Sequence, residues 1–164
     1  MKLIPIYGKG GCVVAQSKVD ETDFAALNRC RWHLSSDGYA QRSWRRADGT
    51  TRTVTMQRQI LGLQQGERLY GDHINRDRLD NRRRNLRAVT PEQSAQNRAE
   101  RATSLTGHRG VNFVKTTGKF IARVRIGSPG KLYNLGTYST AEEAARIAAA
   151  FRAEHMPFSE EAAA

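Results

Sequence analysis

A carboxylate and an imidazole stand side by side at Asp72-His73, ahead of a polar stretch that reaches Asn85. Aspartate binds hard divalent cations, and a histidine beside it can take a proton from water at the same point. Guanidinium groups bind phosphate through paired hydrogen bonds. Six arginines lie in or beside the polar stretch: Arg76, Arg78, Arg82, Arg83, Arg84 and Arg87. These residue types in this order predict metal and acid–base chemistry on a phosphate ester.

The segment 71–75, continued by 79–87, resembles the core of the His-Asn-His (HNH) endonucleases, in particular the phage and intron-encoded homing type. The resemblance implies that His73 is the general base and that Asp72 binds one Mg²⁺ or Mn²⁺ ion. It also implies that Asn85 bridges the loop and orients the base. Double-stranded DNA is the implied partner, and the arginines expected to contact it here are Arg82, Arg83, Arg84 and Arg87.

Two positions depart from the HNH pattern. Relatives place an asparagine that completes the metal site where this chain has Ser94, whose hydroxyl has a shorter reach. The second metal ligand is therefore expected to be either Asn97, three residues later on the same predicted helical face, or Ser94 itself. Gln57 also stands where relatives often carry a histidine. These departures keep a second interpretation open, a non-catalytic DNA-binding protein with a degenerate HNH site.

The composition of the chain is strongly basic. It has 27 lysines and arginines against 16 aspartates and glutamates, a formal net charge of +11 over 164 residues. This excess favours a polyanionic partner, and nucleic acid fits it best. No apolar run or signal pattern predicts membrane attachment, so we expect a cytoplasmic protein of a bacterial or phage-infected cell, as a monomer or weak dimer. Cys12 and Cys30 lack the spacing of a zinc site or a disulfide scaffold.

Hydrophobic patterning divides the chain into four segments. Residues 1–53 read as short strands and turns with one helical stretch, which predicts a β-rich lead-in. Residues 54–99 form the expected HNH core, in which a strand, a loop, a second strand over 70–74 and a helix surround a metal. Thr90 is expected to cap that helix over 91–100. Residues 100–106 are predicted to be a linker, and 107–164 a second domain.

The second domain has a different pattern. No acidic residue occurs between Glu100 and Glu142. Residues 120–126 alternate between apolar and basic side chains, which predicts a three-stranded antiparallel sheet with one cationic face. Residues 140–143 form a capping box that begins a helix running to about residue 154.

Residues 107–158 resemble the ERF-type (ethylene-response-factor, APETALA-like) DNA-binding domain of plant transcription factors. The resemblance is carried by Arg109-Gly110-Val111, Gly118-Lys119-Phe120 and Leu135-Gly136-Thr137-Tyr138. In that family the sheet enters the major groove. The residues implied to contact DNA are Arg109, Lys115, Lys119, Arg123, Arg125 and Lys131.

The expected fold class is α+β: a ββα-metal (HNH) core behind a β-rich lead-in, plus a small three-stranded antiparallel sheet packed on one helix. The expected function is metal-dependent hydrolysis of phosphodiester bonds in DNA, by nicking or double-strand cleavage, with the basic sheet binding the target.

Overall fold

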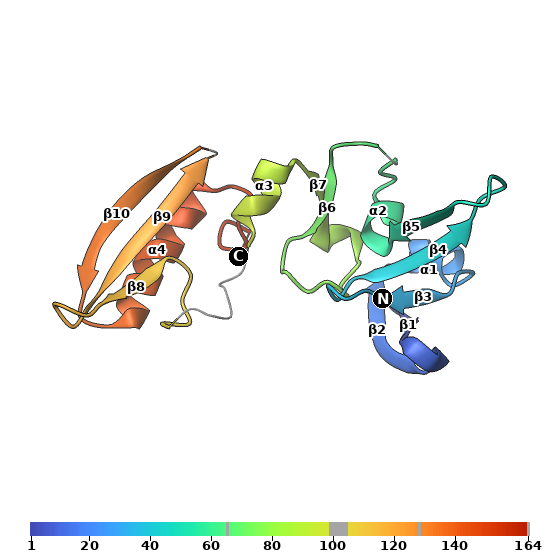
Figure 1. Ribbon diagram of the computed structural model, residues 1–164, viewed down its shortest axis with the longest axis horizontal. Coiled ribbons are helices and arrows are strands. Elements are labelled where there is room, and N and C mark those ends of the chain that lie inside the picture. Colours follow the sequence, from blue (N-terminus) through green and yellow to red (C-terminus); the bar gives the residue numbers. More distant parts are fainter. Residues whose placement is uncertain (65, 99–104, 128, 164) are drawn as a thin grey trace. The chain divides into compact units, whose positions relative to one another are not determined.

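The computed structural model describes residues 1–64, 66–98, 105–127 and 129–163, and the chain forms two compact units, residues 1–90 and 91–164. The architecture is mixed α and β, with separate sheets in the two units (Figure 1). These units differ from the four predicted segments, because the helix after Thr90 belongs to the second unit. Most of the predicted linker, 100–106, lies outside the described residues. No helix within the described residues is long and apolar enough to cross a membrane.

A five-stranded sheet in the order β2-β1-β3-β4-β5 forms the frame of the first unit (Figure 1). β1 pairs antiparallel with β2 and parallel with β3, and β4 joins β3 and β5 in antiparallel pairs. The elements are β1 (Lys2–Tyr7), η1 (Lys9–Gly11), β2 (Val13–Val19), α1 (Glu21–Leu27), β3 (Trp32–Leu34), β4 (Ala40–Arg45), β5 (Thr51–Thr55) and α2 (Met56–Ile60). The predicted strands and helix of the lead-in are therefore present, whereas α2 was not predicted.

The core of the first unit closes around Trp32, which is fully buried and donates its indole N–H to the Leu27 carbonyl at 2.9 Å. Met56 and Ile60, four residues apart on α2, both face this core, and that spacing places them on one side of a helix. The other buried apolar members are Ile4, Ile6, Val19, Leu27, Ala40 and Leu86. Cys12 and Cys30 are free thiols.

A short antiparallel hairpin, β6 (Tyr70–His73) and β7 (Leu86–Val89), follows in the same unit. β6 coincides with the predicted strand at 70–74, but β7 was not predicted. The loop between them contains η2 (Arg83–Asn85) and lies against β2. Two backbone bonds of 2.8 Å attach it, from Lys18 N to the Leu79 carbonyl and from Asn81 N to the Lys18 carbonyl. The lead-in and the β6–β7 hairpin are therefore one folded body.

Three antiparallel strands form the sheet of the second unit, in the order β10-β9-β8, as predicted. They are β8 (Val111–Val114), β9 (Lys119–Gly127) and β10 (Gly130–Tyr138). The helix α4 (Ala141–His155) covers one face, where its Ala144 and Ala148 are fully buried against the strands. Thr140 caps α4, because its hydroxyl accepts a hydrogen bond from Glu143 N at 3.2 Å, which is one of the two bonds of the predicted capping box.

The remaining helix, α3 (Pro91–Gln96), is shorter than the predicted helix over 91–100, whose last two residues lie outside the described part of the chain. Two hydrogen bonds attach its end to the second unit. Arg109 Nη1 donates to the Gln96 carbonyl at 2.9 Å, and Phe158 N donates to Gln96 Oε1 at 3.1 Å. These contacts explain why α3 groups with residues that follow it.

Candidate active site

His73 ends β6 with only 4% of its surface exposed. Its Nε2 lies 3.2 Å from Asn81 Oδ1, and its ring lies 5.9 Å from that of Tyr39, centroid to centroid. Asn81 in turn donates from Nδ2 to the Ser17 hydroxyl at 2.9 Å. Ser17 Oγ is also 3.0 Å from the Leu79 carbonyl, to which it donates. All three side chains of this chain of bonds are buried.

The direction of these bonds assigns the histidine tautomer. Asn81 uses its NH₂ group on Ser17, so the oxygen of its amide faces His73. A carbonyl oxygen accepts and cannot donate, so the proton of a neutral His73 lies on Nε2. The lone pair then lies on Nδ1, the nitrogen that can act as a base.

Burial lowers the pKa of His73 below its ordinary value, because a charged imidazolium is poorly solvated there. The hydrogen bond to Asn81 and the carboxylates of Asp72, Asp77 and Asp80 act in the opposite direction, but burial outweighs them. His73 is therefore neutral at pH 7, which is the state a general base requires.

Asp72 lies on the opposite face of β6 from His73, because side chains alternate along a strand. It stands directly across the hairpin from Arg87. Both Nε and Nη2 of Arg87 lie 2.9 Å from Asp72 Oδ2, and the Asp72 side chain is 13% exposed. The carboxylate predicted to hold a metal is thus ion-paired with an arginine predicted to bind DNA.

Asn85 connects the two ends of the loop that follows His73. Its Oδ1 accepts from Asn75 N at 3.0 Å, and its Nδ2 donates to the Asp80 carbonyl at 2.8 Å. The backbone adds a bond from Ile74 N to the Asn85 carbonyl at 2.9 Å. A carboxamide suits this place because it donates and accepts at once. Asn85 thus bonds to the backbone of its own loop, and its predicted role in orienting the base stays a prediction.

Residues 71–96 match the family model described as HNH endonuclease. The matched segment covers the hairpin β6–β7, its loop and α3. No curated protein and no solved structure matches the chain. The HNH match supports a nuclease that acts on DNA.

The donor set at Asp72 suits a hard cation. Among the described residues, no three histidine, cysteine, aspartate or glutamate side chains gather closely enough to hold a metal by themselves. A site with one carboxylate, completed by neutral oxygens, water and a substrate phosphate, is typical of Mg²⁺. Zinc would require more nitrogen or sulfur ligands. The residues present therefore fit the ion that HNH nucleases use.

Ser94 and Asn97, the two candidates for the second ligand, belong to the second unit. Ser94 is half-buried on α3. Asn97 is buried and follows the last helical residue, so it lies in a turn and not on the helical face that was predicted. Its backbone N donates to the Ser94 carbonyl at 3.2 Å. The choice between the two as ligands stays a prediction.

Gln57, the other departure from the HNH pattern, is buried on α2 beside β6. A Cβ atom added to Gly71 would lie 2.7 Å from Gln57 Cγ, so the glycine allows this close approach. The Gln57 Oε1 atom is buried and has no hydrogen-bond partner among the described residues. This amide lies next to the residue that precedes Asp72.

Most of the arginines predicted to bind DNA near His73 are occupied by carboxylates. Arg82 pairs with Asp80 and holds the pKa of that carboxyl below its ordinary value. Arg83 forms two bonds to Asp23, at 2.8 and 2.7 Å. The four candidates are Arg82, Arg83, Arg84 and Arg87. Of these, only Arg84, which is exposed, forms no ion pair with a described residue. These pairs mainly fasten the loop to its own unit.

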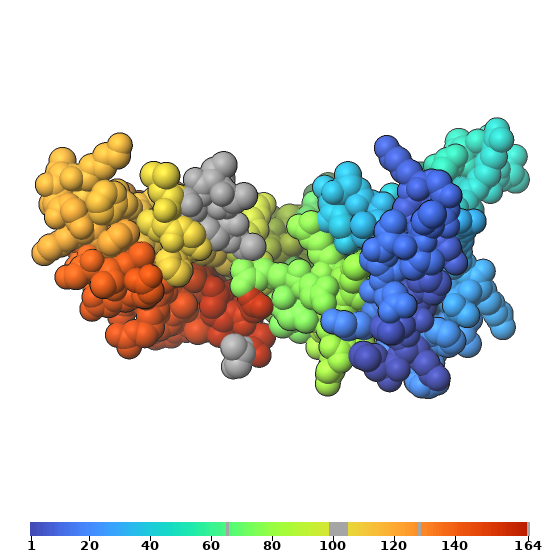
Figure 2. All heavy atoms as spheres, turned by 90° about the horizontal axis from the view of Figure 1, so that it is seen from below, coloured from blue at the N-terminus to red at the C-terminus, as the bar shows by residue number. Residues whose placement is uncertain are grey.

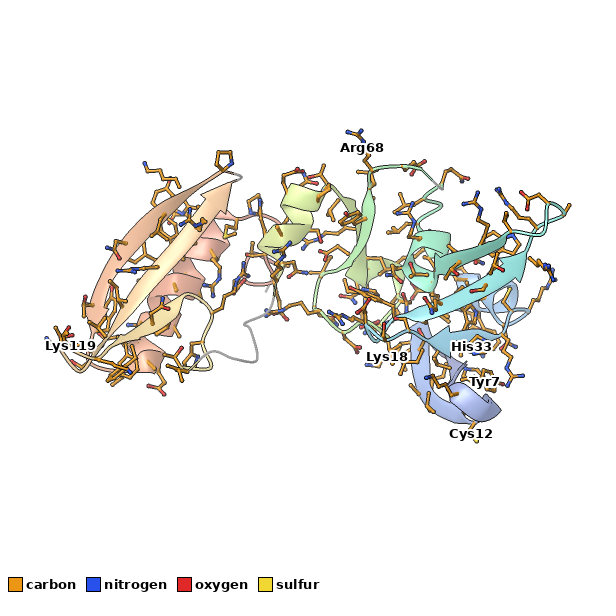
Figure 3. The ribbon with its side chains drawn as sticks, in the orientation of Figure 1. Tyr7, Cys12, Lys18, His33, Arg68 and Lys119 are labelled. Atoms are coloured by element: carbon orange, nitrogen blue, oxygen red, sulfur yellow. The ribbon has the colours of Figure 1, made fainter. Side chains whose placement is uncertain are left out.

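The six candidates of the second unit do not share one face. Lys119, Arg123 and Arg125 alternate along β9, opposite the face that α4 covers (Figure 3 labels Lys119). Exposed Lys115 follows β8 in the adjoining turn. Lys131 stands across from Ile126 and shares its face, which is the helix side and not the side of Lys119, Arg123 and Arg125. Arg109 is bonded to the end of α3.

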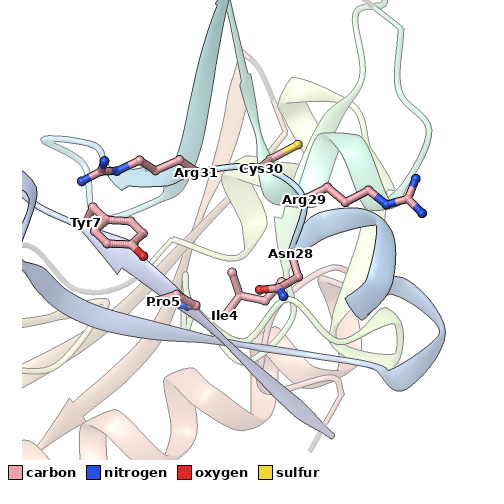
Figure 4. A pocket seen from close by; sticks show the side chains of 7 residues that line it. All are labelled: Ile4, Pro5, Tyr7, Asn28, Arg29, Cys30 and Arg31. Atoms are coloured by element: carbon pink, nitrogen blue, oxygen red, sulfur yellow. The ribbon is translucent and has the colours of Figure 1, made fainter.

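A separate hollow of about 300 Å³ lies in the first unit, between β1 and the segment 28–31 (Figure 4). Arg31 covers the ring of Tyr7 there, with its Cζ 4.3 Å from the ring centroid. None of the predicted site residues lines this hollow, whose lining residues are Ile4, Pro5, Tyr7, Asn28, Arg29, Cys30 and Arg31.

The residues that surround His73 were missed by sequence reasoning. Asn81 lies within the motif 79–87, but its neighbour Asn85 received the orienting role. Ser17 and Tyr39 carry no local signal at all, because they reach the site from strands and turns of the lead-in. Only the fold brings them to His73.

Proposed function

We propose that the protein is a divalent-metal-dependent DNA endonuclease in which His73 is the general base. The observation that carries this proposal is the buried chain Ser17–Asn81–His73, which holds a neutral imidazole with its proton on Nε2. Two of its members, His73 and Asn81, lie within the segment that matches the HNH endonuclease family. In this tautomer the lone pair that would accept a proton lies on Nδ1.

In the proposed reaction, His73 Nδ1 takes a proton from a water molecule, whose oxygen attacks the phosphorus of a DNA phosphodiester. The bond from phosphorus to the 3′ oxygen breaks. Asp72 would hold the Mg²⁺ or Mn²⁺ ion. The ion would stabilise the negative charge that develops on the phosphate and on the departing oxygen. Asn85 keeps the loop closed, so that Asn81 stays against the base.

The exposed basic face of β9 would bind the target duplex. Lys119, Arg123 and Arg125 share that face, and residues 105–139 contain no acidic side chain. Arg84 is the further contact proposed in the first unit. We keep Lys115 as a neighbouring phosphate contact.

Two observations favour a second candidate, a DNA-binding protein that does not cut. His73 is 4% exposed, so water reaches it only if its surroundings move. Asp72 is paired with Arg87, which a metal ion would have to displace or share. The basic surfaces serve either function.

Supercoiled plasmid incubated with Mg²⁺ or Mn²⁺ separates the two candidates. The endonuclease is expected to relax or linearise the plasmid, and His73→Ala is expected to lose on the order of 10²–10⁴ in rate. His33→Ala, which changes an exposed histidine of the same unit, is the matched control and should cut normally. Circular dichroism checks that each variant is folded.

Intact plasmid with either metal, from a protein that still binds DNA, would support the non-cutting candidate. Equal cutting by wild type and folded His73→Ala would show that His73 is not the base.

A further inference from the structure

The hairpin of β4 and β5 carries cations without acidic partners. Residues 40–55 contain four arginines and a single acidic residue, Asp48. Within the described parts of the chain, none of the four forms an ion pair: Arg42, Arg45, Arg46 and Arg52. In the stretch that follows His73, by contrast, Arg82, Arg83 and Arg87 are each paired with a carboxylate. The hairpin therefore presents four cations, none of them ion-paired with a described carboxylate, on one short two-stranded element.

One face of the hairpin combines this charge with an exposed aromatic ring. Residues paired across strands share a face, and here Arg42 pairs with Val54 and Trp44 with Arg52. Trp44 is 40% exposed, although Trp32 in the same sheet is fully buried. The Arg42 guanidinium lies 5.0 Å from the centroid of the Trp44 ring. An exposed tryptophan between guanidinium groups is suited to pack on a nucleic acid.

The turn that joins the two strands is held by hydrogen bonds and a glycine. Asp48 Oδ1 accepts from Thr50 N at 2.9 Å and from the Thr50 hydroxyl at 2.6 Å. Gly49 takes the positive φ, +80°, that the turn requires. Two views of the molecule show this turn extending beyond the rest of the first unit (Figures 1 and 2). The one acidic residue of the hairpin, Asp48, therefore hydrogen-bonds to Thr50 within the turn and forms no ion pair with the described arginines of the hairpin.

We propose that the β4–β5 hairpin is a second DNA-binding element, which docks as a two-stranded ribbon on duplex DNA. The major groove is wide enough to admit such a ribbon. Arg45 and Arg46, next to the turn, contact phosphates, and Trp44 becomes covered by the DNA. The proposal rests on the proposed function only for the choice of duplex DNA as partner, because the hairpin acts in binding and not in cutting.

Salt-dependent binding of the full chain to a duplex, measured by fluorescence anisotropy in EDTA, tests the charges. Each lost phosphate contact lowers the slope of log affinity against log salt by about 0.9, so Arg45→Gln with Arg46→Gln is expected to lower it by about 1.8. The matched control removes two exposed cations elsewhere in the unit, Lys9→Gln with Arg29→Gln. It should leave the slope unchanged.

Tryptophan fluorescence tests the aromatic ring. The chain has two tryptophans, and Trp32 is buried, so acrylamide quenching reports mainly on Trp44. Saturating duplex is expected to protect wild type from acrylamide, and Trp44→Phe should remove the quenchable component.

The proposal would be overturned if the arginine double variant bound DNA with the same slope of log affinity against log salt as wild type, and if bound DNA did not protect Trp44 from acrylamide. That outcome would leave the proposed nuclease intact, since plasmid cutting is measured separately. Protection of Trp44 without DNA at rising protein concentration would also overturn it, because the ring would then be covered by a second copy.

Discussion

A histidine acts as a base only if one ring nitrogen lacks a proton and the other is held. In this protein a single side chain makes the assignment: Asn81 presents its oxygen to His73 Nε2 because its NH₂ group is bound to Ser17. Asn85, which the HNH resemblance selected, acts on the backbone of the loop instead. Asn81 therefore sets the tautomer of His73, and Asn85 holds the shape of the loop.

Exchanging Asn81 tests this assignment. Asn81→Leu removes the acceptor at Nε2, so we expect a fraction of His73 to carry its proton on Nδ1 and cleavage to fall on the order of 10–10²-fold. Nitrogen-15 chemical shifts of the imidazole report the tautomer directly. Asn81→Asp keeps an acceptor and should keep the proton on Nε2. An unchanged tautomer in folded Asn81→Leu would refute the role.

The pH dependence of cleavage follows from the burial of His73. Burial lowers the pKa of His73 from its ordinary value of about 6.5, so the base stays unprotonated to lower pH. We expect the rate to fall with acidification at a midpoint below about 6.5. Asp77 raises this pKa, so Asp77→Asn should move the midpoint lower still, whereas exposed Asp37→Asn should not. Rate measurements across pH at saturating metal give the midpoint, and one above 6.5 would contradict the expectation.

Short elements position the residues of the candidate site. β7 has four residues, too few for an alternating pattern to appear, yet its pairing places Arg87 across from Asp72. In the second unit, one glycine allows the loop before β8 to approach β9. Gly110 has φ +81°, and its carbonyl accepts from Arg123 N at 2.7 Å.

Replacing Gly110 should destabilise the second unit. An added Cβ would lie 2.6 Å from the Arg123 carbonyl oxygen, and the positive φ adds strain, so Gly110→Ala is expected to cost about 1–3 kcal/mol. Gly118→Ala is the control, because φ there is +65° but no atom lies within 4 Å. Urea unfolding followed by circular dichroism measures both. Equal effects would mean that the close contact adds nothing.

Over the whole molecule, positive charge is distributed unevenly. In the second unit basic side chains line the face of β9 that α4 does not cover, and in the first unit four arginines lie on the β4–β5 hairpin. The arginine run that follows His73 looked in sequence like the main DNA-binding surface. Three of its arginines instead form ion pairs with Asp23, Asp72 and Asp80, which stabilise the first unit.

DNA binding by the exposed face of β9 is tested by comparing a double variant on that face with one on the opposite side of the same unit. Arg123→Gln with Arg125→Gln is expected to lower the salt slope of DNA binding by about 1.8, one contact for each arginine. Lys131→Gln with Arg146→Gln removes the same charge from the side that carries α4, and we expect little change. Similar slopes for the two double variants would argue against docking through the β9 face.

The HNH match and the second sheet could be predicted because their signals are local. A motif such as 71–75 with 79–87, or the alternation over 120–126, is a property of contiguous residues. The surroundings of His73 had no such signal. Ser17 reaches Asn81 across 64 positions of the chain, and Arg83 reaches Asp23 across 60. Contacts of this range depend on how distant strands pack, so only the tertiary structure shows that Asn81 contacts His73 and that Arg82, Arg83 and Arg87 are ion-paired.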